Sequence, residues 1–172
     1  FRQSEQVRAV IQTRSFEEAE YLLFATKNGI VKKTKLAAYN TPLKADGIIA
    51  IKMRDGDELV GVRHSTGEND VLMVSRNGQA IRFGEKDVRP MGRDASGVQG
   101  MRLRGDDEVI SVNIAHDDSD LLVVTENGYG KRTRIADYPR KGRGGLGVKT
   151  VHLTEAKGHL AGARVVRDGY QV

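Results

Sequence analysis

An all-β fold built from repeated four-stranded units is predicted by three features of this 172-residue chain. The dipeptide Asn-Gly recurs at Asn28, Asn77 and Asn127, so the sequence repeats about every 50 residues. Each Asn-Gly lies between two short runs of residues that favour strands. No segment has the apolar spacing of a convincing helix. A fixed period in this range with four short strands per unit indicates the blades of a β-propeller.

Each unit begins with an apolar strand that Asn-Gly connects to a returning strand. The first strands are predicted at residues 21–25, 71–74 and 121–124, and the returning strands at 30–33, 79–83 and 129–132. Asn-Gly predicts a type I′ turn between them, because that turn needs positive φ at both central residues. A linking segment with proline and glycine follows each returning strand.

A repeated glycine and a repeated acidic turn define the second half of each unit. Gly47, Gly97 and Gly147 precede predicted third strands at 48–51, 98–101 and 148–151. Asp57-Glu58, Asp107-Glu108 and the degenerate Gly158-His159 precede predicted fourth strands at 59–62, 109–112 and 160–163.

These elements divide the chain into three whole blades and parts of two others. Residues 1–20 are expected to contain the end of a preceding blade, with its last strand at 6–11, and a linker. Blades are expected at 21–69, 70–119 and 120–169, and residues 170–172 begin a further blade. Because propellers close with about four to eight blades, we interpret the chain as part of a larger polypeptide with an incomplete propeller.

Composition argues against several classes of function. The chain contains no cysteine, so a disulfide framework is excluded and secretion gains no support. No apolar run approaches the roughly 18 residues of a membrane-spanning helix. The four histidines lack zinc-ligand spacing, and no clustered acid–base pair indicates catalysis. We therefore expect a cytoplasmic setting, no membrane contact, and no catalytic or metal site in this segment.

The positive charge is concentrated at one position of the repeat. The net charge is +5, but segments 27–54, 76–104 and 126–149 together hold 21 of the 28 Lys and Arg and 6 of the 23 Asp and Glu. Because equivalent segments occupy equivalent places in each blade, this recurrence predicts a basic stripe. Such a stripe is typical of proteins that bind a polyanion, although charge runs also serve simply as solvated surface.

The third repeat contains a glycine-rich basic element, Tyr138-Pro139-Arg140-Lys141-Gly142-Arg143-Gly144-Gly145-Leu146-Gly147. Glycine lets the backbone approach a surface closely, and flanking cations supply charge-assisted contacts to phosphate oxygens. The glycine spacing also matches a dinucleotide-binding fingerprint, which we reject because a strand rather than a helix is predicted to follow. The element favours contact with a nucleic-acid backbone without base readout.

Cations on or just after the returning strands, and those beside the repeated glycines, are the candidate DNA-binding residues. The alternative for the strand cations is that they protect sheet edges from aggregation. The candidates are Lys32, Lys33, Lys35, Arg82, Arg93, Lys131, Arg132, Arg134, Arg140, Lys141, Gly142, Arg143, Gly144, Gly145 and Gly147.

Over essentially its whole length the chain resembles the C-terminal domain of the A subunit of bacterial DNA gyrase, and less closely that of topoisomerase IV. The supporting segments are 25–29, 74–78, 89–93, 96–101 and 130–133. Residues 141–147 resemble that family's signature, Gln-Arg-Arg-Gly-Gly-Arg-Gly, but depart from it at Lys141, Gly142 and Leu146. We interpret them as a secondary, box-like element, because at least two repeats precede it.

The resemblance implies a six-bladed β-pinwheel, in which strands are exchanged between blades, and a rim that bends duplex DNA. It also implies partners, namely double-stranded DNA, the rest of the A subunit of gyrase, and the B subunit of gyrase. ATP and Mg²⁺ would be bound elsewhere in the parent enzyme, and this segment would carry no cofactor. The alternatives are a protein-interaction propeller with a basic rim and the equivalent domain of topoisomerase IV.

Overall fold

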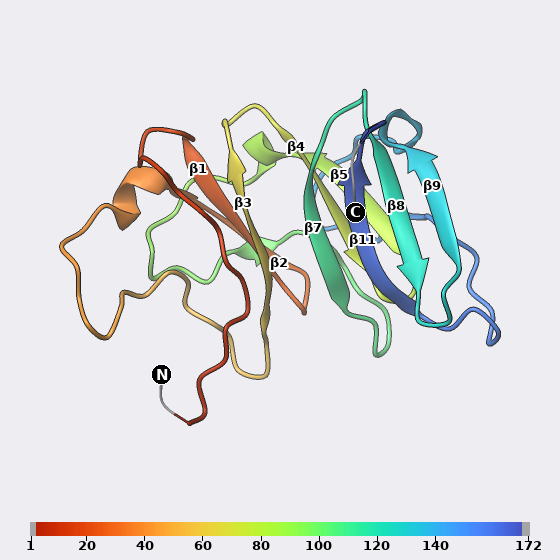
Figure 1. Cartoon of the computed structure of the whole chain (residues 1–172), viewed down its shortest axis with the longest axis horizontal. Helices are drawn as coiled ribbons and strands as arrows, with labels where there is room; N and C mark the ends of the chain where they lie inside the picture. Colours follow the sequence, from red (N-terminus) through yellow and green to blue (C-terminus); the bar gives the residue numbers. More distant parts are fainter. Residues whose placement is uncertain (1–2, 170–172) are drawn as a thin grey trace.

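Three antiparallel sheets follow one another along the chain in a computed structural model that describes residues 3–169 (Figure 1). The strand order of the first sheet is β3 (Leu59–Ser65), β1 (Tyr21–Thr26), β2 (Ile30–Lys35) and β6 (Val98–Gln99). That of the second is β10 (Val148–Lys149), β5 (Gln79–Gly84), β4 (Asp70–Ser75) and β7 (Val109–Ala115). That of the third is β11 (Leu160–Val166), β8 (Asp120–Thr125) and β9 (Gly130–Arg134). The predicted all-β fold is therefore confirmed.

The four-residue length assigned to the third strands is wrong, whereas the exchange of strands between blades that the family resemblance implies is confirmed. Residues 48–51 form no strand, and the other two are the two-residue strands β6 and β10. Each pairs with the returning strand of the preceding repeat, β6 with β2 and β10 with β5. A sheet thus contains strands from two successive repeats. Within the described residues, the third sheet has three strands instead of the expected four.

The repeated glycine permits this exchange by allowing two backbones to approach closely. A Cβ added to Gly97 would lie 2.5 Å from the carbonyl oxygen of Val31. A Cβ added to Gly147 would likewise collide with the Ala80 carbonyl group. Nothing lies within 4 Å of a Cβ added to Gly47, whose segment crosses no preceding strand in the described chain.

The hairpin turns differ from the predicted type I′. Among the described residues, positive φ is confined to glycines, so Asn28, Asn77 and Asn127 do not have it. The N–H of Gly29 donates to the Thr26 carbonyl at 3.0 Å, and φ of Gly29 is 88°. This geometry is a type I turn followed by a left-handed glycine, which adds one residue to the loop. The Thr26 hydroxyl also accepts the N–H of Ile30, a bond that Ser75 and Thr125 repeat in the other hairpins.

Two apolar clusters join successive sheets. The first brings Leu23 and Val31 of the first sheet against Met73 and Val112 of the second. The second cluster packs Leu72 of the second sheet against apolar residues of the third sheet. Three short 3-10 helices follow the returning strands, η1 (Leu36–Tyr39), η2 (Glu85–Asp87) and η3 (Ile135–Asp137). These contacts fix the blade-to-blade geometry on which any shared surface depends.

The strand predicted at residues 6–11 is wrong, since the structure places no strand there. A strand needs a neighbour for its backbone groups, and none of the described strands pairs with this segment. The segment instead contacts the first blade through Ile11, which packs beside Leu22 and Phe24, and through an Arg8–Glu58 ion pair. The predicted blade start at 170–172 lies outside the described residues.

Candidate nucleic-acid interface

The connections after the returning strands form a continuous layer across the three repeats. The N–H of Lys52 donates to the carbonyl of Ala95 at 3.1 Å, and that of Arg102 donates to Gly145 at 2.8 Å. These are equivalent bonds, because both donors and acceptors step by 50 residues. The N–H of Gly144 adds a bond of 2.7 Å to the Gly100 carbonyl. We call the segments 40–54, 89–104 and 139–154 the outer loops.

The outer loops carry eight cations whose side chains have no hydrogen-bond or ion-pair partner within residues 3–169. All are exposed except Arg93, which is half-buried beside Lys44 in a hollow of about 440 Å³. They are Lys44, Lys52, Arg89, Arg93, Arg102, Arg104, Lys141 and Lys149. Unpaired cations on adjoining loops can attract phosphate groups without first breaking an internal ion pair.

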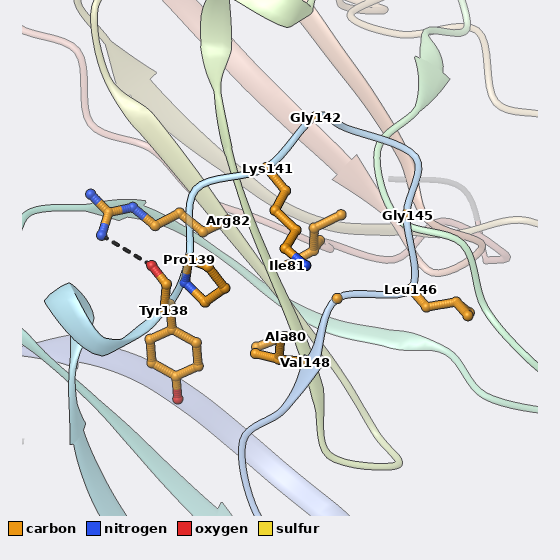
Figure 2. A pocket seen from close by; sticks show the side chains of 11 residues that line it. Ala80, Ile81, Arg82, Tyr138, Pro139, Lys141, Gly142, Gly145, Leu146 and Val148 are labelled. Atoms are coloured by element: carbon orange, nitrogen blue, oxygen red, sulfur yellow. Dashed lines mark hydrogen bonds between the residues drawn. The ribbon is translucent and has the colours of Figure 1, made fainter.

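The glycine-rich element crosses over β5 and encloses a pocket of about 250 Å³ (Figure 2). The backbone N–H of Lys141 donates to the Arg82 carbonyl at 2.9 Å, which fixes one end of the element. Arg143 fixes the middle, because its guanidinium donates to the carbonyls of Asp87 at 2.9 Å and Gln99 at 3.0 Å. Gly142 has open space around it, and the Lys141 side chain extends over Ile81 (Figure 2).

Arg140 lies beside this element and is tied to the neighbouring blade. Its Nε is 3.0 Å from Asp70 Oδ1, and its guanidinium lies against Gly84, where a Cβ would collide with it. The side chain remains more than half exposed. Arg140 therefore combines an ion pair with a surface position near Lys141.

Lys32 and Lys33 are buried, so their assignment as surface contacts is corrected. The amine of Lys32 donates to the carbonyls of Ala50 at 2.6 Å and Arg93 at 2.7 Å. That of Lys33 donates to the Glu85 carbonyl at 2.9 Å and lies 3.8 Å from the Glu85 carboxylate. The reason is their place in the sheet, since β2 lies between β1 and β6 and is covered on both faces.

Arg82 has the same position in the second blade as Lys33 has in the first, and it makes an equivalent contact with the next blade. Its guanidinium donates to the Ile135 carbonyl at 3.1 Å, and Ile135 stands 50 residues after Glu85. It also forms ion pairs with Asp70 at 2.9 Å and Asp117 at 2.8 Å. We call the Lys33–Glu85 and Arg82–Ile135 contacts the inter-blade clasps. Arg82 is thus already paired and largely buried, which corrects its assignment as a free DNA contact.

The remaining strand cations are more exposed. Lys35 has no side-chain partner within the described residues, whereas Lys131 donates to the Thr150 carbonyl at 3.0 Å. Arg132 pairs with Asp120 and Asp168, and Arg134 with Asp137. Ion pairs at such exposed positions are weak. These four residues remain candidates.

Burial lowers the pKa of Lys32 to about 8, with a smaller contribution from Arg93 against the attraction of Asp94. The unfolded chain holds this proton to a higher pH, so the free energy of unfolding should rise between about pH 8 and 10.5. The rise should reach about 3 kcal/mol at most. Denaturation of the wild type and of Lys32→Met at pH 7.5 and 10 measures it, because the variant lacks this titration. A stability difference that does not change with pH would contradict the prediction.

The structure adds cations that the site prediction missed. Lys52 and Arg102 occupy equivalent positions, as do Arg54 and Arg104, and Lys149 and Arg89 are also exposed on the outer loops. The 50-residue step from 52 to 102 and from 54 to 104 is the signal in the sequence that could have found them. Arg54 differs from Arg104 in donating to the Gly97 carbonyl at 3.0 Å.

Two other kinds of feature are absent from the described residues. None of the helices there is long and apolar enough to cross a membrane. No group of three or more His, Cys, Asp or Glu side chains in the same range could hold a metal ion.

Comparison with known proteins relates the chain to one family. The model of the DNA gyrase C-terminal domain, a β-propeller, matches residues 20–65, 69–116 and 119–167. The A subunit of DNA gyrase from Mycolicibacterium smegmatis is 49% identical over 98 residues, which is 56% of this chain and 12% of that protein. The A subunit of DNA gyrase from Clostridium acetobutylicum is 46% identical over 92 residues, or 54% of this chain and 11% of that protein. The matched segment thus spans only about a tenth of these relatives.

Solved structures with the same fold include two topoisomerase domains. The C-terminal domain of DNA topoisomerase IV aligns with a TM-score of 0.84 at 31% identity, over 92% of this chain and 50% of that one. The DNA gyrase A C-terminal domain aligns with a TM-score of 0.84 at 26% identity, over 96% and 55%.

Proposed function

Because the chain belongs to the DNA gyrase C-terminal domain family, we propose that it is a non-catalytic module that binds duplex DNA and bends it around the outer loops. Within the A subunit of a gyrase, this bending would present a DNA segment for passage and support ATP-dependent negative supercoiling. The rest of the A subunit, together with the B subunit of gyrase, would supply its protein partners in the cytoplasm. The predicted absence of a cofactor from this segment stays a prediction.

The proposal rests on the eight outer-loop cations whose side chains have no partner among residues 3–169. Backbone hydrogen bonds connect these loops from one repeat to the next, so the loops that carry the cations adjoin one another. Each phosphate that a cation neutralises releases a counterion, which drives binding of any DNA sequence. Bending a site by 40–90° costs on the order of 1–6 kcal/mol, so several contacts on successive blades are needed to offset it.

The glycine-rich element suits a phosphate backbone better than a folded protein surface. Gly142 is exposed, and nothing would lie within 4 Å of a Cβ added there, so DNA can approach the main chain at this point. Lys141 and Arg140 place positive charge beside that approach. This combination favours DNA over the alternative, an acidic protein partner. The equal TM-scores leave the topoisomerase IV domain as the second candidate.

Titration of linear duplexes of several lengths across salt concentrations tests the proposal. With roughly six phosphate contacts, log K should fall with log salt with a slope of about −5, without sequence preference. Longer duplexes should bind more tightly until they span the whole surface. A flat salt response, or tighter binding to one sequence, would contradict DNA wrapping and favour a protein partner.

Replacing Arg93 and Lys141 with alanine should weaken duplex binding and flatten the salt slope by about 1.8, or 0.9 for each lost phosphate contact. Both side chains lack internal polar partners in the described chain, so the fold should be retained. The matched control is Arg63→Ala with Arg164→Ala, which removes two cations from β3 and β11, far from the outer loops in strand order. If the control pair were equally damaging, overall charge rather than its placement would bind DNA.

Replacing Gly142 with arginine should strengthen duplex binding and steepen the slope by about 0.9. The change adds a cation where the family signature has one, and the backbone there does not need positive φ. Gly142→Gln is the control, because it adds similar bulk without charge. Equal affinities of the two variants would show that this position does not contact phosphate.

A further inference from the structure

The edge strands β3, β7 and β11, one from each sheet, place polar side chains at one equivalent position. Figure 1 shows β3, β7 and β11 following one another across the molecule. Each is an edge strand of its sheet: β3 lies opposite β6, β7 opposite β10, and β11 opposite β9. Arg63 stands opposite Leu23, Asn113 opposite Leu72, and Arg164 opposite Leu122. Since these leucines are themselves equivalent in the repeat, Arg63, Asn113 and Arg164 occupy the same register position in successive blades.

These three residues line a single hollow. Its volume is about 480 Å³, and Ile114, Ala163 and Val165 complete its wall. Asn113 is 4% exposed, and its Nδ2 donates to Ser111 Oγ at 2.7 Å. Ser111 Oγ in turn donates to the Ala163 carbonyl at 2.8 Å, which ties β7 to β11. The Asn113 amide is therefore held in place and retains a second N–H.

The hollow holds two positive charges without a carboxylate partner in the described chain. Arg63 donates one N–H to the adjacent Val62 carbonyl at 2.8 Å, and the Arg164 side chain has no hydrogen bond or ion pair within residues 3–169. Arg82, Arg132 and Arg167, by contrast, each pair with aspartate. Desolvation, and then the like charge of Arg164, lower the pKa of Arg63. A guanidinium stays charged despite such shifts.

We propose that Arg63, Asn113 and Arg164 form a binding site for one phosphate group, supplied by inorganic phosphate or by a small phosphate monoester. A guanidinium presents paired donors that match two oxygens of a phosphate, and a tetrahedral phosphate offers oxygens to two guanidinium groups at once. The anion would remove the repulsion between the two arginines and connect β3 of the first sheet with β11 of the third. This site is separate from the outer loops and does not depend on DNA binding.

Calorimetric titration with inorganic phosphate, at constant ionic strength set by chloride, tests the site. The wild type should saturate at millimolar phosphate. Arg63→Gln and Arg164→Gln should each weaken binding at least about tenfold, as expected for loss of a hydrogen bond to a charged group. Arg104→Gln, which removes an equally unpaired arginine from an outer loop, should bind phosphate as the wild type does. Absence of phosphate binding, or an equal loss in Arg104→Gln, would overturn the proposal.

Further measurements keep the test decisive. Arg63→Lys and Arg164→Lys retain the charge but lose the paired donors, so weaker phosphate binding in these variants supports the site even if a glutamine variant unfolds. Adenosine monophosphate in place of inorganic phosphate distinguishes an ester from the free ion as ligand. Arg164→Gln should bind duplex DNA as the wild type does. Displacement of phosphate from the wild type by duplex DNA would overturn the assignment to a small ligand.

Discussion

Replacing Lys33 with alanine is expected to lower the free energy of unfolding by about 3–5 kcal/mol, the usual loss when one partner of a buried ion pair is removed. The side chains of Lys33 and Glu85 are 5% and 0% exposed, and their charged atoms lie 3.8 Å apart. The alanine variant leaves the Glu85 carboxylate buried with two neutral donors, the Ser65 hydroxyl at 3.0 Å and the Asn69 N–H at 2.9 Å. It also removes the hydrogen bond to the Glu85 carbonyl, which joins the first blade to the second.

Urea denaturation at pH 7 measures this loss, and Lys35→Ala is the matched control. Lys35 ends the same strand but is exposed, so its replacement should change stability by no more than about 0.5 kcal/mol. The Lys33 variant should keep the wild-type salt slope for DNA at temperatures where it is folded. Equal unfolding free energies of the two variants would show that the Lys33–Glu85 contact does not stabilise the fold. If the salt slope of duplex binding were flatter by about 0.9 in the Lys33 variant, Lys33 would be shown to contact a phosphate.

The repeat made most of the blade predictable from the sequence. Strands β3, β7 and β11 begin at the predicted residues Leu59, Val109 and Leu160, because a turn at the same place in each repeat precedes them. The exchange of the strand after each repeated glycine was expected only from the family resemblance and does not follow from the repeat itself. Pairing is a contact between residues far apart in the chain, and Val98 looks alike in sequence whether it pairs within its own repeat or with Val31 of the preceding one.

Whether the candidate residues bind DNA stays a prediction, and the structure decides only which of them are exposed. Charge counting identified the segments that form the outer loops, but it could not tell which lysines the fold covers. On a two-sided interior strand even consecutive residues are buried, so Lys32 and Lys33 are both removed from solvent. The same strand position in the third sheet leaves Lys131 and Arg132 exposed, because β9 has no outer neighbour among the described strands. Exposure of a repeated cation is therefore decided by strand pairing.

Replacing Gly147 with alanine is expected to lower the free energy of unfolding by more than about 3 kcal/mol. Gly147 has a φ of 73°, a left-handed conformation that costs a residue with a side chain about 1–2 kcal/mol. Its new Cβ would also lie 2.6 Å from the carbonyl carbon of Ala80, so β10 must separate from β5. Separation strains the bond from Thr150 N–H to the Gly78 carbonyl, and each buried backbone group left unpaired costs about 1–3 kcal/mol.

Gly47→Ala isolates the contribution of this close approach. Gly47 has a nearly identical φ of 74°, but nothing lies within 4 Å of its added Cβ. This variant should therefore lose only the conformational cost of about 1–2 kcal/mol. Gly147→Ala should also weaken duplex binding, although it removes no cation, because β10 holds one end of the glycine-rich element against the second blade. Equal unfolding free energies for the two variants would show that β10 can leave β5 without cost. Unchanged duplex binding in Gly147→Ala would show that the cations bind DNA even when β10 no longer holds the glycine-rich element in place.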